Sequence, residues 1–214
     1  MKKNRAWIVT GWFVLAAIVL AACSSVSGPT SANTPGANVP VTGAAFDEMF
    51  INMMVPHHQG AVEMAKIALE RAEHPEIKEM ANAIISSQEG EITQMKDWKQ
   101  QWYGSSDTPS MSEMPSLQEM PGMGGSGHAM DMQAEVERLK NAPEPFDLAF
   151  IDAMIPHHQS AIDAAKSAQN QATQPEIKEM AQAIINAQQK EIDQMNAWRK
   201  EWYPDAPPAG TSGQ

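Results

Sequence analysis

Apolar residues recur at helical spacing through the first half of the chain. Between about residues 45 and 72, Phe50, Met54, Ala61, Ala65 and Ala68 follow one another at intervals of three, four or seven positions. This is the periodicity of one face of a helix. The pattern therefore predicts a long amphipathic helix over this stretch.

A second helix is predicted from Pro75 to about Tyr103. Proline is favoured in a first helical turn, where its missing N–H would have no partner, and Glu76 and Glu79 place negative charge at the positive end of the helix dipole. Only a few residues separate the two helices, so they should form an antiparallel hairpin. One face of the second helix carries a stripe wide enough to pack on a partner helix: Ile77, Met80, Ile84, Gln88, Glu91, Met95, Trp98 and Trp102.

The second half of the chain repeats the first. Residues 75–81 recur unchanged at 175–181, and Phe46, Asp47 and the run 57–59 also recur one hundred positions later. Such self-similarity indicates a duplicated structural unit, so repeat 1 is assigned to residues 44–103 and repeat 2 to residues 146–203. One hairpin buries too little surface alone, and we expect the two to pair into an all-α four-helix bundle.

The connection between the repeats, residues 104–145, is much longer than a bundle turn requires. It is long enough to run the full length of the bundle, which permits a ferritin-like crossover, although the sequence leaves this topology open. Residues 133–140 are expected to form a short helix within it.

Residues 1–22 have the pattern of a secretory signal peptide. Three basic residues precede an apolar run from Ala6 to Ala22, and Cys23 stands at the cleavage position. The pattern resembles the bacterial lipobox, which makes Cys23 the predicted lipidation site. An uncleaved anchor is the alternative, but about 17 apolar residues is the short limit for a span. Either interpretation places the rest of the chain outside the cytoplasm.

Composition limits the chemistry. The formal net charge is −11, and the signal segment is positive, so the remainder has no electrostatic footprint for nucleic acid. Cys23 is the single cysteine, which excludes disulfides and thiolate metal sites. Residues 23–43 are small and polar and predict a flexible tether, and residues 204–214 predict a disordered tail.

Each repeat contains two adjacent histidines, in the segments 54–59 and 154–159. Counted from the turn near residue 73, His58 lies at the same height as Gln88 and Met54 at that of Glu91, so both polar residues lie at the level of the histidine pair. A buried carboxylate is costly unless it is paired or bound to a cation, so Glu91 should contact His58, and Glu191 should contact His158. Such a pair could simply lock the hairpin. The adjacent histidine, the methionine one turn away and the duplication of the set favour a metal site.

Pro56 adds a geometric expectation. A proline inside a helix removes a backbone hydrogen bond and disfavours helical geometry at the preceding residue. We expect a kink or a restart there, which would place His57 and His58 in a first turn. The helix dipole would then disfavour the imidazolium and favour the neutral ring that binds metals.

Methionines form a second group of metal-binding candidates. Met49, Met53, His57 and Met64 share one helical stripe, and alanine replaces all three methionines in repeat 2. The stripe lies about 100° around the helix from His58, which allows it to be exposed. The linker adds six methionines and one histidine. Because the linker is polar and offers no hydrophobic core, these methionines are not needed for core packing. The candidates are Met111, Met114, Met120, Met123, His128, Met130 and Met132.

The ligand types narrow the choice of metal. Thioethers and imidazoles without thiolates suit Cu(I), whereas imidazole with carboxylate suits Cu(II). Zinc is compatible with the His and Glu positions but does not explain the methionines. Calcium and magnesium would require sets of oxygen ligands that the sequence does not provide.

These residues together resemble a known family. Phe46, Met54, the HHQ run at 57–59, Glu91 and Trp98 are similar to the domain of unknown function 305 family, in two copies covering about 46–103 and 146–203. The resemblance implies a four-helix, ferritin-like fold and, for periplasmic CopM-type members, copper binding through Met and His with a contribution to copper resistance. It implies as ligands Met54, His57, His58 and Met95, with Met154, His157, His158 and Met195.

We therefore expect a lipid-anchored, non-enzymatic protein of the cell envelope that binds copper, with Cu(I) favoured. It would buffer the ion, exchange it with a donor or acceptor protein, or contribute to resistance. A ferritin-like di-metal oxidase is the enzyme alternative, but the Glu-x-x-His motif of such sites occurs at neither histidine pair. The third interpretation is a structural bundle whose methionines scavenge oxidants.

Overall fold

The computed structural model describes residues 43–113 and 132–207, which belong to one compact unit. Their elements, in chain order, are α1 (Ala44–Arg71), α2 (Pro75–Tyr103), the 3-10 turn η1 (Met111–Glu113), α3 (Met132–Lys140), α4 (Phe146–Gln171) and α5 (Pro175–Trp202). The expected all-α architecture is confirmed, and the short linker helix is α3.

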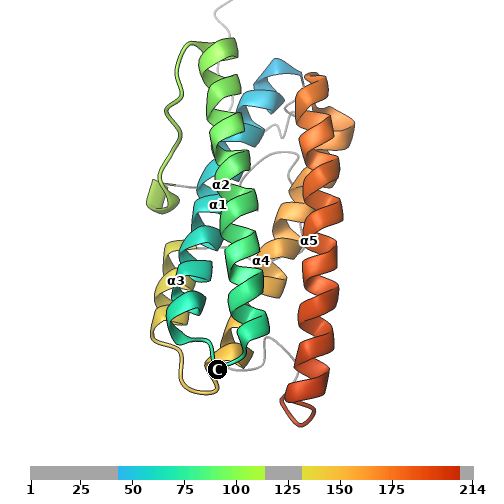
Figure 1. Cartoon of the computed structure of the whole chain (residues 1–214). Helices are drawn as coiled ribbons and strands as arrows, with labels where there is room; N and C mark the ends of the chain where they lie inside the picture. Colours follow the sequence, from blue (N-terminus) through green and yellow to red (C-terminus); the bar gives the residue numbers. More distant parts are fainter. Residues whose placement is uncertain (1–42, 114–131, 208–214) are drawn as a thin grey trace, which may run out of the picture. The chain divides into compact units, whose positions relative to one another are not determined.

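Two antiparallel hairpins form the bundle (Figure 1). Helix α1 packs on α2, helix α4 packs on α5, and the hairpins meet where α1 packs on α4. Because Asp47 at the start of α1 contacts Thr173 after the end of α4, these two helices run antiparallel. Helices α2 and α4 consequently point the same way, and the connection between them must return the chain to the opposite end. The ferritin-like assignment itself remains a prediction.

Each hairpin helps to fill the core of the other. At one end of the bundle Phe46 and Phe50 of α1 pack with Ala165 of α4 and Ile184 of α5. At the other end Phe146 and Phe150 of α4 pack with α1 and α2. Full burial of one phenylalanine side chain contributes roughly 1.5–3 kcal/mol to stability. The repeats therefore form a single interlocked core.

Two buried aspartates tie the repeats together. Asp47 accepts hydrogen bonds from the backbone N–H groups of Thr173 and Gln174, at 2.9 and 3.2 Å, and from the Thr173 hydroxyl. Asp147 accepts from the backbone N–H groups of Glu73 and His74, at 3.0 and 2.8 Å. Each carboxylate thus satisfies backbone donors in the turn that precedes a helix of the other repeat.

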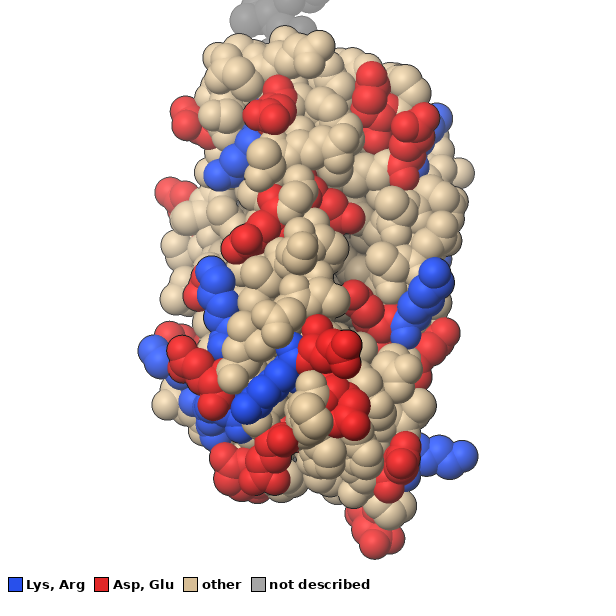
Figure 2. Space-filling view, viewed as in Figure 1, with Lys and Arg blue, Asp and Glu red and all other residues tan. Residues whose placement is uncertain are grey.

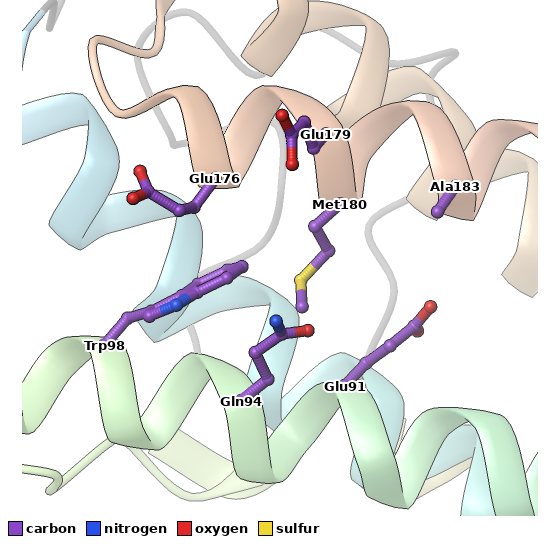
Figure 3. A pocket seen from close by; sticks show the side chains of 7 residues that line it. All are labelled: Glu91, Gln94, Trp98, Glu176, Glu179, Met180 and Ala183. Atoms are coloured by element: carbon purple, nitrogen blue, oxygen red, sulfur yellow. The ribbon is translucent and has the colours of Figure 1, made fainter.

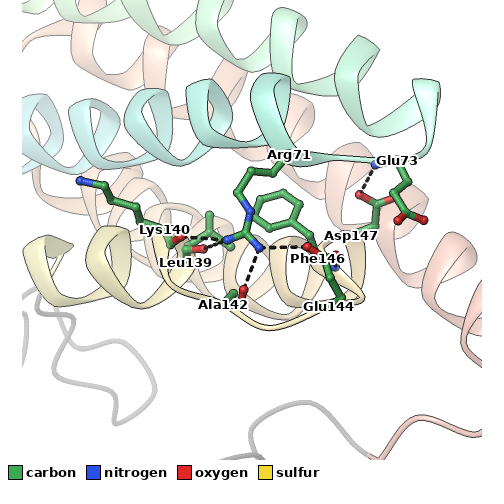
Figure 4. A network of polar contacts seen from close by, with 8 residues as sticks. All are labelled: Arg71, Glu73, Leu139, Lys140, Ala142, Glu144, Phe146 and Asp147. Carbon is green, nitrogen blue, oxygen red and sulfur yellow. Dashed lines mark hydrogen bonds and ion pairs between the residues drawn. The ribbon is translucent and has the colours of Figure 1, made fainter.

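Arg71 anchors the end of the linker to α1 (Figure 4). Its guanidinium donates to the carbonyl oxygens of Lys140 and Ala142, both at 2.8 Å, and to that of Leu139 at 3.3 Å. It also lies 4.5 Å from the centre of the Phe146 ring. Cations suit the C-terminal end of a helix, so Arg71 fixes α3 in place. Within the described ranges, no helix has the length and apolar character needed to cross a membrane.

Candidate metal centre

The four histidines of the two HHQ runs lie together where α1 crosses α4. The ring centres of His57 and His157 are 3.9 Å apart, whereas His58 lies 6.2 Å from His57 and His158 lies 6.5 Å from His157. All four residues are buried. The structure thus brings the two copies of the motif into one cluster, which spacing within a single repeat could not show.

The expected restart of the helix at Pro56 is wrong. Helix α1 continues through Pro56 from residue 44 to residue 71, so His57 and His58 lie in the middle of a helix and not in a first turn. Val55, Pro56 and both histidines are buried. Tertiary packing on both sides of the proline holds the helical path although one backbone bond is missing.

The predicted contact between His58 and Glu91 is present, and it recurs in repeat 2. His58 Nε2 lies 2.7 Å from Glu91 Oε2, and His158 Nε2 lies 2.6 Å from Glu191 Oε2. A carboxylate only accepts hydrogen bonds, so Nε2 carries a proton, and in the neutral ring Nδ1 then keeps a lone pair. In both rings Nδ1 is buried and has no hydrogen-bond partner among the described residues.

This geometry changes the expected role of the glutamates. Histidines that bind metals commonly donate their second ring nitrogen to a carboxylate, which fixes the orientation of the ring. Glu91 and Glu191 occupy that outer position, while the open atom in each repeat is the Nδ1 of the histidine. Gln88 and Gln188, one turn away, are also buried with an unpartnered amide oxygen.

His57 is held by a residue that the sequence did not single out. Ser160 donates its hydroxyl proton to the carbonyl oxygen of His157 at 2.7 Å, so its oxygen accepts from His57 Nε2, also at 2.7 Å. The Nδ1 atom of His57 is again a buried lone pair without a partner in the described part of the chain.

Two of these rings are held in the neutral form. Burial lowers the pKa of His57 well below its usual value of 6.5, and charge on His157, His58 or His158 would lower it further. Burial also lowers the pKa of His158, against the opposing effect of Glu191. Neutral imidazole is the form that binds a metal ion.

His157 differs from the other three. Its Nδ1 lies 3.2 Å from Glu135 Oε2 on α3, and its Nε2 lies 3.2 Å from the carbonyl oxygen of His57. Both ring nitrogens therefore face hydrogen-bond acceptors. The cluster offers three open Nδ1 atoms, and His157 supplies none while α3 is docked.

The methionines named as ligands are core residues. Met54 and Met95 are fully buried in the core cluster at one end of the bundle, and Met154 and Met195 are fully buried in the other. The methionine stripe, Met49, Met53 and Met64, was expected to be free for exposure, and this expectation is wrong for two of the three residues. Met53 and Met64 are fully buried and Met49 is partly buried, because they pack in core clusters that include residues of α4 and, for Met64, of α3.

Two linker methionines approach the cluster. A Cβ added to Gly60 would lie 3.4 Å from His157 Cε1, 3.6 Å from Met132 Cβ and 3.7 Å from Met111 Sδ. Met111 and Met132 are therefore placed near His157. The other predicted site residues, Cys23, Met114, Met120, Met123, His128 and Met130, lie outside the described residues.

A pocket of about 320 Å³ lies between α2 and α5 beside Glu91 (Figure 3). Glu176, Glu179 and Met180 of α5 face Gln94 and Trp98 of α2 across it. Through Glu91, this pocket adjoins the carboxylate that holds His58.

The described residues, 43–113 and 132–207, do not form a ready-made site of three or more His, Cys, Asp or Glu ligands.

Sequence reasoning missed Ser160 and Glu135. The difference between Gly60 and Ser160 in otherwise matching repeats was a visible signal for Ser160. Glu135 gave no signal, because its contact with His157 depends on how the linker docks.

Comparisons with known proteins identify relatives. CopM in its Cu(I)-bound form is 39% identical with a TM-score of 0.60, covering 73% of this chain and 97% of CopM. The Cu(II)-bound form is 41% identical with the same score and coverage. A DUF305 fragment from Deinococcus radiodurans is 28% identical, with a TM-score of 0.57, and covers 74% of this chain and 97% of its own.

A shorter match is with an uncharacterized protein of Acanthamoeba polyphaga mimivirus, 43% identical over 49 residues. It spans 23% of this chain and about a third (32%) of the viral protein. The profile of the domain of unknown function DUF305 matches residues 47–199, which is most of the chain. The chain therefore belongs to the DUF305 family.

Proposed function

We propose that this protein binds copper, with Cu(I) favoured, and acts outside the cytoplasm in copper buffering, transfer or resistance. The observation that carries the proposal is the set of three buried Nδ1 atoms, on His57, His58 and His158, each without a partner among the described residues. A buried polar atom left unpaired is costly. A bound cation would remove that cost.

The relatives support this choice of metal. CopM has been solved with Cu(I), Cu(II) and silver bound, and the likeness spans nearly all of CopM. The acidic surface of the present chain supports it more weakly: red side chains spread over the face in Figure 2 with fewer basic ones between them. A negative surface concentrates cations nearby.

Each residue has a distinct role in the proposed site. His58 and His158 bind through Nδ1, with Glu91 and Glu191 orienting the rings, and His57 binds through Nδ1 with Ser160 orienting it. The thioethers of four buried methionines supply soft ligands: Met54, Met95, Met154 and Met195. We propose no catalytic residue and no enzymatic activity.

The N-terminal segment completes the proposal. Cys23 would carry a lipid that anchors the protein in the cell envelope, facing the periplasm or the exterior. The methionines of the linker would capture the ion and pass it to the bundle, and a donor or acceptor protein would exchange it.

The direct test is competition for Cu(I) against a chelator of known affinity, using the full chain purified in detergent. Replacing His58 and His158 with Asn together should lower the stoichiometry, since both open nitrogens are lost. The matched control is His74→Asn, which removes a histidine at the α1–α2 turn and should leave copper binding unchanged. Equal stoichiometry in the double variant and the wild type would refute the site.

A further inference from the structure

We propose that Glu135 is a positioning residue that withholds His157 from the metal, so that the histidine cluster presents three open imidazoles and not four. This inference rests on the proposed copper binding and adds a control element to it. The linker helix α3, which belongs to neither repeat, would thereby set how many histidine ligands the cluster offers.

The first support is a difference in the ring nitrogen that each hydrogen-bond partner contacts. Ser160, Glu91 and Glu191 all take the Nε2 side of their histidine. Glu135 instead takes Nδ1 of His157, at 3.2 Å. The atom that is open in the other three rings is therefore the atom that Glu135 covers in the fourth.

The second support is the difference between the repeats at one position. Ser160 in repeat 2 holds His57, but its counterpart in repeat 1 is Gly60, which has no side chain to hold His157 in return. The space beside Gly60 is bordered by His157, Met132 and Met111. The linker thus occupies the place that the repeat leaves open, and it brings Glu135 with it.

The third support is that α3 is firmly docked. Met132 and Leu139 at its two ends are each 2% exposed, and the Glu135 side chain is only 13% exposed. Arg71 holds the final carbonyl groups of α3 (Figure 4), while the corresponding residue of repeat 2 is Gln171. Glu135 therefore contacts His157 from a fixed scaffold and not from a mobile segment.

The first experiment reads the ring directly in the full chain without metal. Long-range ¹H–¹⁵N spectra of the histidine rings should show His157 Nδ1 change from a hydrogen-bonded to a free nitrogen in Glu135→Ala. The matched control is Glu137→Ala, an exposed position on the same helix, which should leave the His157 signals unchanged. An unchanged His157 in Glu135→Ala would overturn the proposal.

The second experiment measures copper. Glu135→Ala should bind one more equivalent of Cu(I) than the wild type in chelator competition, and adding His157→Asn should remove that equivalent. In the wild-type background, His157→Asn should leave the stoichiometry unchanged.

The outcomes separate the two proposals. If the wild type binds Cu(I) and Glu135→Ala binds the same amount, Glu135 does not withhold His157, while the proposed function stands. If the wild type binds no Cu(I), both proposals fail. Circular dichroism on each variant confirms that it is folded. A second variant, Glu135→Gln, keeps an amide that can still contact the ring, so the amount of Cu(I) that it binds should lie between that of the wild type and that of Glu135→Ala.

Discussion

The rings of His57 and His157 lie 3.9 Å apart at an angle of 37°, although one hundred positions separate them in the chain. They meet because α1 and α4 cross at the same point of both repeats, and Nε2 of His157 lies 3.2 Å from the carbonyl oxygen of His57. The duplication thus creates a histidine pair that no single repeat contains.

Stability of the metal-free protein should fall as the pH is lowered. The pKa of His57 is well below 6.5 in the folded protein, so below about pH 6.5 the unfolded chain takes up a proton that the folded chain does not. The free energy of unfolding should fall by up to about 1.4 kcal/mol per pH unit for each buried histidine of this kind. The fall should end once the pH is below the lowered pKa. Urea unfolding between pH 8 and 5, run with a chelator present, measures it. His57→Asn should reduce the slope, and a slope equal to that of the wild type would contradict the assignment.

Ser160→Ala should weaken both folding and copper binding. Without the hydroxyl, His57 Nε2 becomes a buried donor with no partner, which costs about 1–3 kcal/mol. Loss of an orienting group also lowers metal affinity about 10- to 100-fold. Ser167→Ala is the control, since that hydroxyl bonds only within its own helix, to the carbonyl oxygen of Asp163. Comparable copper affinity in the two variants would show that Ser160 does not orient a ligand.

Glu91→Ala and Glu191→Ala should each reduce copper affinity about 10- to 100-fold without removing a ligand. The stoichiometry at saturating copper should therefore stay at the wild-type value, because Nδ1 of each histidine remains. Chelator competition at two chelator strengths separates affinity from stoichiometry. Glu89→Ala, exposed on the same helix, is the control. A lost equivalent in Glu91→Ala would instead make Glu91 a direct ligand.

Asp147→Ala should destabilise the whole bundle by roughly 1.5–3 kcal/mol, because a charged acceptor of several hydrogen bonds is lost and backbone donors of the α1–α2 turn are left unpaired. Because the two cores interlock, unfolding should remain one cooperative transition. Denaturant unfolding followed by tryptophan fluorescence and circular dichroism tests both points. Asp97→Ala, an exposed position, should have little effect, and two separate transitions in Asp147→Ala would show that the hairpins fold independently.

The sequence was sufficient for features within one hairpin. Helical periodicity and Pro75 located the helices. Counting outward from the turn placed Gln88 opposite His58 and Glu91 at the level of the histidine pair, and the structure has His58 Nε2 2.7 Å from Glu91 Oε2. These relationships depend on a short turn and a regular helical rise, so residue numbers translate directly into height along the hairpin. The duplicated sequence then transferred the same contact to His158 and Glu191.

Sequence reasoning failed where tertiary packing overrides local preference. Pro56 predicted a kink or a restart in α1, yet the helix does not restart, because the packed surroundings hold it. The methionine stripe was expected to be free for exposure, yet Met53 and Met64 are fully buried in core clusters that include residues of α4 and, for Met64, of α3. Local signals describe one helix at a time, whereas burial depends on which elements lie against it.

By itself, the sequence determined the repeats, the helices and the chemical types of the candidate ligands. The tertiary structure alone decided which nitrogen of each histidine is open, because Ser160 and Glu135 reach His57 and His157 only through the crossing of α1 with α4 and the docking of α3. Hydrogen-bond partners set the open lone pair on an imidazole ring. Partners from distant parts of the chain become identifiable only once the chain is folded.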